Sequence, residues 1–124
     1  MNFINKIKEE VKRNKKRIIL PETMDERIIK AAEIAIMENI ADIILIGDEI
    51  ELTKNNDILK QATIINPKTS DLTENYVNQL VELRKDKGMT KEEATKLLLE
   101  DYMYFACMMV KAGDADGVVS GAIT

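Results

Sequence analysis

The chain has 124 residues, 45% of them hydrophobic, which suits one globular domain with its own core. It contains no histidine and one cysteine, which excludes histidine-dependent catalytic triads, an internal disulfide and the usual zinc sites. The net charge is −4 and no apolar run approaches the roughly 20 residues that span a bilayer, so we expect neither nucleic acid nor a membrane as partner.

Residues 1–17 are the basic part of the chain, with seven basic and two acidic side chains. Such a segment can serve as a nucleic-acid or membrane arm. However, Ile4, Ile7 and Val11 recur at helical spacing, so we expect a helix over residues 3–14 whose lysines and arginines occupy the solvent face. The acidic residues also argue against an import presequence, and no apolar secretory segment follows, which predicts a cytoplasmic protein.

A strand, a helix and a second strand follow with short connections. Residues 17–21 form a short apolar strand that ends at a proline, and residues 25–38 carry a helical apolar face. Thr23 and Glu26 have the spacing of a capping box at the start of this helix. The run 42–47 is mostly apolar, as are strands of a parallel sheet with both faces covered. The segment therefore predicts a βαβ unit.

The rest of the chain is mainly helical before one last strand. Gly88 and Gly113 stand where helices should end, and Thr90 and Glu93 form a second capping box. The expected elements are short helical turns within residues 48–60, a strand over 62–66, helices over 71–86, 91–100 and 102–112, and a strand over 116–120. Strands alternating with helices predict an α/β fold, a three-layer α/β/α arrangement with a mostly parallel sheet.

The last strand runs into a turn of small residues, Ser120, Gly121 and Ala122. In α/β proteins, such a turn at the carboxyl end of a strand can hold an anion against backbone N–H groups, and the helix that follows it adds a favourable dipole. The serine hydroxyl can donate a hydrogen bond, and glycine lets an anion approach the backbone closely. We expect Ser120 and Gly121 to bind substrate; the alternative is an ordinary turn that ends the strand.

Two segments resemble the phosphate acetyltransferase (phosphotransacetylase) family. The first is the Leu-Pro-Glu turn and Asp-Glu-Arg helix start within residues 17–32. The second is the Arg-Lys-x-Lys-Gly-x-Thr stretch of residues 84–90, followed by the Ala-Asp-Gly-x-Val-Ser-Gly-Ala strand and loop of residues 115–122. The resemblance implies that residues 1–124 are the N-terminal α/β domain, incomplete, of a two-domain enzyme.

The same resemblance implies an activity and its partners. The reaction is exchange of an acetyl group between coenzyme A and inorganic phosphate, giving acetyl phosphate. Coenzyme A is a substrate, and neither a cofactor, a metal nor a covalent enzyme intermediate is implied. The resemblance also implies a homodimer.

Arg84 matches the family arginine that contacts substrate, and we expect it to be catalytic. Its guanidinium offers a planar fork of donors suited to a phosphate group. The alternative is a surface arginine that stabilises the negative end of a helix.

Other polar residues have structural explanations. We expect Glu22, Asp25, Glu26 and Arg27 to cap the helix or to pair locally. Asp114 and Asp116 could bind a cation, but a solvated turn is the simpler interpretation. Cys107 lies in an apolar segment, which favours a packed thiol over a nucleophile.

The family's general-base aspartate and its other substrate arginines have no counterpart before Thr124, so we expect no acetyl transfer by this chain alone. Two other interpretations of the chain remain open: a non-catalytic module that binds an anion or coenzyme A, and an oligomerisation domain. In the latter, Ala106, Met108, Met109 and Val110 would lack a covering element and the chain would self-associate. A phosphate butyryltransferase-like acyltransferase is a further alternative.

Overall fold

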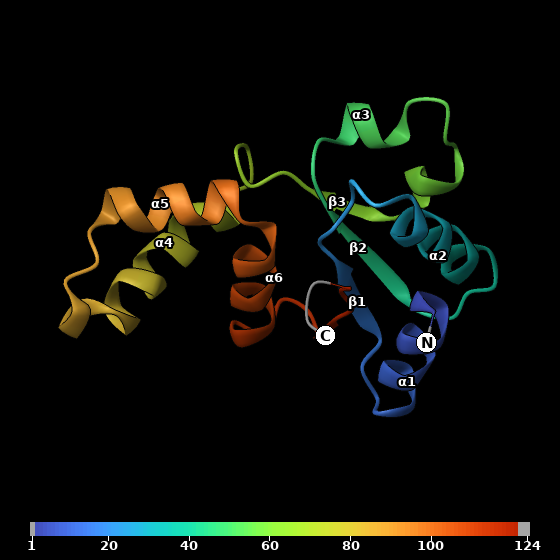
Figure 1. Ribbon diagram of the computed structural model, residues 1–124, viewed down its shortest axis with the longest axis horizontal. Helices are drawn as coiled ribbons and strands as arrows, with labels where there is room; N and C mark the ends of the chain where they lie inside the picture. Colours follow the sequence, from blue (N-terminus) through green and yellow to red (C-terminus); the bar gives the residue numbers. More distant parts are fainter. Residues whose placement is uncertain (1, 122–124) are drawn as a thin grey trace.

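The computed structural model describes residues 2–121, and its elements follow the predicted order (Figure 1). They are α1 (Phe3–Lys12), β1 (Arg17–Leu20), α2 (Glu26–Met37), β2 (Asp42–Ile46), α3 (Glu49–Thr53), the 3₁₀ turn η1 (Ile58–Gln61), β3 (Thr63–Ile65), α4 (Leu72–Leu83), the 3₁₀ turn η2 (Lys85–Lys87), α5 (Lys91–Glu100), α6 (Tyr102–Lys111) and β4 (Gly117–Val118). The short helical turns expected within residues 48–60 are α3 and η1.

The strands form one parallel sheet in the order β3-β2-β1-β4. Strand β1 is central, and its Ile18 pairs with Ile43 of β2 on one side and Gly117 of β4 on the other. The Val119 N–H donates to the Ile19 carbonyl at 3.0 Å, which continues the contact past β4. This arrangement confirms the α/β fold with a parallel sheet.

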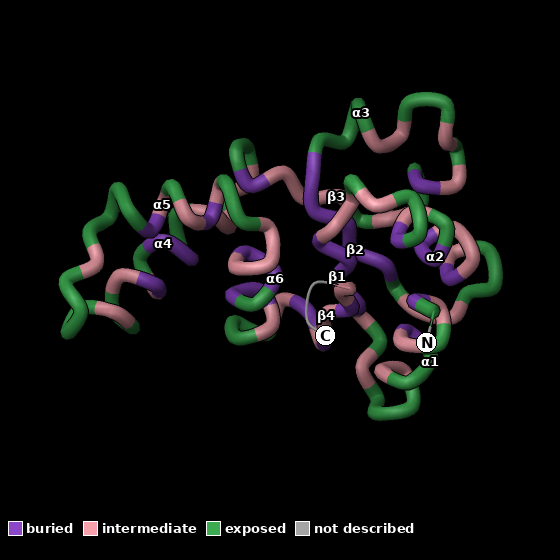
Figure 2. The backbone as a smooth tube through the Cα atoms, viewed as in Figure 1, coloured by how far each residue is buried: buried purple, intermediate pink, exposed green. Residues whose placement is uncertain are grey.

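Alternate side chains of the central strands pack into two separate hydrophobic cores, because successive side chains of a strand point to opposite faces of the sheet. Ile18 and Leu20 pack with α1 and α2, whereas Ile19 packs with α4, α5 and α6. Figure 1 shows α4 beside α5, with α6 between this pair and the sheet and with α1 and α2 on the other side. Figure 2 shows buried residues along β1 and β2 and also on parts of the helices. The three-layer prediction is confirmed.

The helix starts confirm one predicted capping box and correct the other. At α5, Thr90 accepts from the Glu93 N–H and Glu93 in turn accepts from the Thr90 N–H, as expected. The predicted box of Thr23 and Glu26 is wrong, because Asp25 caps α2 by accepting from the Arg27 N–H at 2.9 Å. The Thr23 hydroxyl donates instead to the Ile46 carbonyl at 2.8 Å and ties the β1–α2 turn to the end of β2.

The ends of three helices use residues with positive φ. After α6, Gly113 has φ 83° and donates to the Val110 carbonyl, while the Asp114 N–H reaches back to Met109 at 2.8 Å. This pair of bonds is the Schellman motif, and it confirms the predicted stop at Gly113. Asn14 and Asn39 do the same after α1 and α2, with φ of 63° and 52°. Both tolerate this conformation better than most side chains.

Three predictions about the second half of the chain are corrected. Helix α4 ends at Leu83 and a 3₁₀ turn follows, so the helix is shorter than residues 71–86. Ala106, Met108 and Met109 are buried against the sheet and α4–α5, so α6 does not lack a cover at these positions. Cys107 is exposed instead of packed.

The chemistry of Cys107 nevertheless agrees with an unreactive thiol. Desolvation and the nearby Asp101 raise the pKa of the Cys107 thiol, which favours its protonated form. Within residues 2–121, no helix is both long and apolar enough to cross a membrane.

Candidate functional site

The candidate site lies where the direction in which strands are added to the sheet reverses. From β1 the chain proceeds to β2 and then β3 on one side, whereas β4 returns to the other side of β1. In open α/β sheets, ligands bind outside the carboxyl ends of the strands at such a switch point. The turn after β1 carries Glu22 and the turn after β4 carries Ser120 and Gly121, so these residues meet at that point.

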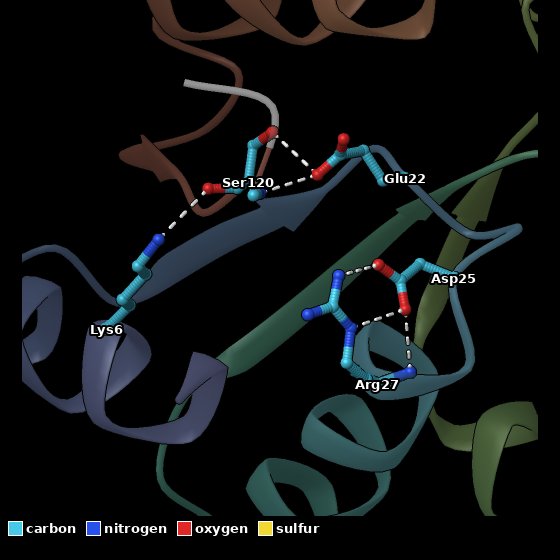
Figure 3. Close-up of polar contacts among 6 residues, drawn as sticks. Lys6, Glu22, Asp25, Arg27 and Ser120 are labelled. Carbon is cyan, nitrogen blue, oxygen red and sulfur yellow. Dashed lines mark hydrogen bonds and ion pairs between the residues drawn. The ribbon is translucent and has the colours of Figure 1, made fainter. Parts of the chain in front are cut away.

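Glu22 holds the Ser120–Gly121 turn through one carboxylate oxygen (Figure 3). The Ser120 hydroxyl donates to Glu22 Oε1 at 2.7 Å, and the Gly121 N–H donates to the same oxygen at 2.6 Å. Hydrogen bonds to an ionised carboxylate are shorter and stronger than those between neutral groups. Sequence reasoning assigned Glu22 to local structure and missed this contact, because nothing in the local pattern joins residues 98 positions apart.

Helix α1 contributes a cation and an aromatic ring to the same turn. Lys6 Nζ donates to the Ser120 carbonyl at 3.4 Å, a contact drawn in Figure 3. A Cβ atom added to Gly121 would lie 2.8 Å from Phe3 Cζ, closer than real side chains allow. The turn therefore needs glycine at this position because Phe3 occupies the space where a side chain would start.

A groove of about 670 Å³ opens beside Gly121 between α1 and α2. Among residues 2–121, its lining includes Lys6, Arg27 and Lys30 and contains no acidic residue, although the protein as a whole is acidic. A second cavity, of about 530 Å³, reaches the starts of the strands at Arg17, Asp42 and Thr63. That cavity is at the opposite end of the sheet from the Ser120–Gly121 turn.

Asp25 and Arg27 pair with each other next to this groove, which confirms the expected local pairing. Arg27 Nη2 donates to Asp25 Oδ2 at 2.8 Å, and the guanidinium carbon lies 5.2 Å from the centre of the Phe3 ring. The Arg27 hydrogen bonds lower the pKa of Asp25, and Asp25 raises the pKa of Arg27. Both groups are therefore fully charged at neutral pH.

Arg84 stands on a different part of the fold from Ser120 and Gly121. It is the C-cap residue directly after α4, and its Nη2 donates to the Tyr104 hydroxyl of α6 at 3.4 Å. The guanidinium carbon lies 6.0 Å from the centre of the Tyr104 ring. The structure thus brings Ser120 and Gly121 together on Glu22, while the described contacts of Arg84 are with Tyr104. Ala122, the third residue of the predicted turn, lies outside the described residues.

Asp114 and Asp116 lie just before β4, at the end of the sheet opposite the Ser120–Gly121 turn. Asp116 accepts from the Arg17 backbone N–H at 2.8 Å and from Arg17 Nη2 at 2.9 Å, and these bonds lower the pKa of Asp116 to about 2. Asp114 accepts from the Tyr76 hydroxyl, and burial together with this bond raises the pKa of Tyr76. Residues 2–121 contain no group of three or more candidate ligand side chains for a metal. The prediction of a solvated turn is corrected for Asp114 and Asp116, because both carboxylates accept hydrogen bonds from other elements of the fold.

Comparisons with known proteins identify the family of the chain. The family described as phosphate acetyl/butaryl transferase matches residues 2–124. The phosphate acetyltransferase of Thermoanaerobacterium thermosaccharolyticum is 47% identical over 99% of this chain and 38% of its own length. That of Acetivibrio thermocellus is 44% identical over 99% of this chain and 37% of its own length.

Solved structures show the same partial match. The EutD phosphotransacetylase from Staphylococcus aureus superposes with a TM-score of 0.77 at 34% identity, over 98% of this chain and 39% of that one. A phosphotransacetylase from Streptococcus pyogenes gives a TM-score of 0.75 at 34% identity, over 98% and 38%. The chain therefore spans less than two fifths of these relatives, and it belongs to the phosphate acetyl/butaryl transferase family.

Proposed function

We propose that this chain is the N-terminal portion of a phosphate acetyltransferase, which exchanges an acetyl group between coenzyme A and inorganic phosphate. The observation that carries the proposal is the Ser120–Gly121 turn at the switch point of the sheet. There a hydroxyl and a backbone N–H converge on one oxygen of a negatively charged group. Acyl transfer to phosphate requires donors of this kind to hold the anion.

The residues have separate roles in this proposal. Ser120 and Gly121 hold the phosphate group, and Arg84 contacts coenzyme A or phosphate through its guanidinium. The reaction also needs a base that helps to ionise the coenzyme A thiol. The family resemblance implies that this base lies beyond residue 124, and the relatives are more than twice as long as this chain. We therefore propose that the chain alone does not turn over.

The parent enzyme in this proposal is a cytoplasmic, two-domain homodimer. Among the described residues, β4 hydrogen-bonds to β1 on one side and forms an edge of the sheet. Such an edge can pair with another chain. Sedimentation of the chain at high concentration tests self-association, and a pure monomer would contradict it.

A binding module without chemistry is the second candidate. It rests on the same observation, because a turn that holds a carboxylate oxygen can also hold another anion without any chemistry. Saturable binding of phosphate or coenzyme A without turnover would support this alternative over catalysis.

The catalytic proposal is tested by measuring coenzyme A release from acetyl-CoA and phosphate. We expect no turnover from residues 1–124 and turnover from a chain extended to the length of its relatives. In the extended chain, Arg84→Ala should reduce kcat/KM at least tenfold, whereas Arg13→Ala should have no effect. Arg13 is the matched control, since it is also the C-cap residue of a helix, and its own side chain is exposed. Turnover by the short chain at the rate of the long one would contradict the proposal, as would equal activity of the two variants.

A further inference from the structure

We propose that Glu22 is a built-in competitor for the anion site: its carboxylate occupies the Ser120 and Gly121 donors, and inorganic phosphate binds there only by displacing it. The inference rests on the proposed phosphate site and assigns Glu22 as the residue that sets the strength of phosphate binding. In this proposal Glu22 holds the Ser120–Gly121 turn and also lowers its affinity for phosphate.

The first argument is the geometry of the contact. Both donors end on a single oxygen, Glu22 Oε1, at 2.7 and 2.6 Å. A phosphate oxygen that accepts the same two hydrogen bonds would have to occupy that position. The two acceptors therefore exclude each other sterically, before any charge is considered.

The second argument is electrostatic. Phosphate and the Glu22 carboxylate are both anions, so phosphate beside an undisplaced Glu22 meets a like charge at short range. Lys6 offsets part of this charge, since its Nζ is bonded to the Ser120 carbonyl. Moving Glu22 away from the turn thus removes both the steric and the electrostatic obstacle.

The third argument is that a displaced carboxylate has a cation nearby. The hydrogen bonds and charge of Asp25 are the main cause of the raised pKa of Arg27, and the negative charge of Glu22 adds to this effect. Arg27 is held by Asp25 in this structure, with two bonds from its guanidinium. Arg27 and Gly121 line the same groove, so a carboxylate displaced from the turn still has a cation at that groove.

The test is a phosphate titration of the 124-residue chain, followed through the amide signal of Gly121 in ¹H–¹⁵N spectra at constant ionic strength. Glu22→Gln keeps an acceptor of similar shape and removes the charge, and neutral hydrogen bonds are about half as strong as charge-assisted ones. Glu26→Gln is the matched control, because it makes the same chemical change on an exposed residue four positions away. We expect Glu22→Gln to lower the phosphate Kd at least tenfold relative to the wild type, and Glu26→Gln to leave it unchanged.

Each other result counts against the inference in a recognisable way. Equal Kd values for Glu22→Gln and Glu26→Gln, or weaker binding by Glu22→Gln, would overturn the competition while leaving the phosphate site intact. Absence of saturable binding in every variant would overturn the competition and the phosphate site together. Glu22→Asp provides a second variant should Glu22→Gln fold poorly, as judged by circular dichroism. Its shorter carboxylate cannot reach both donors equally, so it should also bind phosphate more tightly than the wild type.

Discussion

Replacing Gly121 by alanine should destabilise the protein by about 2 kcal/mol. The new Cβ would lie 2.8 Å from Phe3 Cζ and 3.1 Å from Cε1, whereas an ordinary contact begins at 3.4 Å. Relief of the closer contact needs a displacement of about 0.6 Å, the difference between 2.8 and 3.4 Å, and such overpacking typically costs about 1–3 kcal/mol.

The displacement has two possible routes, and both lose favourable contacts. Phe3 is 8% exposed and packs with the α1–α2 core, so the ring cannot move without losing contacts there. If the turn moves instead, the 2.6 Å bond from the Gly121 N–H to Glu22 is stretched. A hydrogen bond to a charged group contributes about 1.5–3 kcal/mol. The estimate of about 2 kcal/mol lies within both of these ranges.

Urea unfolding followed by circular dichroism measures this effect, with Gly117→Ala as the matched control. At Gly117 the nearest atom to an added Cβ is Lys15 Cδ at 3.2 Å, and this atom belongs to a flexible side chain that is 40% exposed. The control should therefore lose less than about 1 kcal/mol. Phe3→Leu removes the two clashing atoms, so Gly121→Ala should cost much less in that background. An unchanged penalty in the Phe3→Leu background, or no penalty in the wild-type background, would refute the steric argument.

Further predictions concern the other end of the sheet and the start of α5. Asp116→Asn should lower the urea midpoint at pH 7. Because Arg17 depresses the folded pKa of Asp116 to about 2, below its ordinary value of 3.8, the stabilisation is present at neutral pH and lost as pH falls toward 2. The difference between the two proteins should shrink between pH 5 and pH 2, and a constant difference would contradict the assignment. Thr90→Ala removes the N-cap of α5 and should cost about 1 kcal/mol, measured by urea unfolding. Thr95→Ala within the same helix should cost less, since alanine favours helix interiors; equal losses would argue against the capping role.

Much of the fold was predictable because its signals are local. The apolar run of β2 indicated a strand covered on both faces, and Thr90 with Glu93 marked the start of α5. Gly113 marked the end of α6 because glycine adopts positive φ without strain. Each of these features depends on residues within a few positions of one another.

The errors arose where a side chain had two suitable partners. Both Thr23 and Asp25 are good N-cap residues, and the local pattern favoured Thr23 with Glu26. In the folded chain the Thr23 hydroxyl is bonded to the Ile46 carbonyl, a contact across 23 positions, and Asp25 takes the cap. The error at Cys107 has another cause. Its apolar neighbours predicted a packed thiol, although it occupies a solvent-facing position of α6.

The candidate site was predictable only in part, because its contacts join residues that are far apart in the sequence. Ser120 and Gly121 were identified from the small-residue turn that follows a strand. Their partners Glu22 and Lys6 come from the opposite end of the sequence and carry no local signature of the contact. The contact exists because β4 returns to the side of β1, and short-range periodicity does not encode the order of strands in a sheet.

The most direct test of the account compares phosphate binding to the wild-type chain and to Ser120→Ala, with the Gly121 amide signal as the local probe. We predict a saturable shift of that signal in the wild type and at least a tenfold weaker affinity in Ser120→Ala, because the variant lacks the hydroxyl donor of the turn. Equal affinities in the two proteins, or a saturable response confined to Arg17 and Asp116 at the other end of the sheet, would contradict an anion site at this turn.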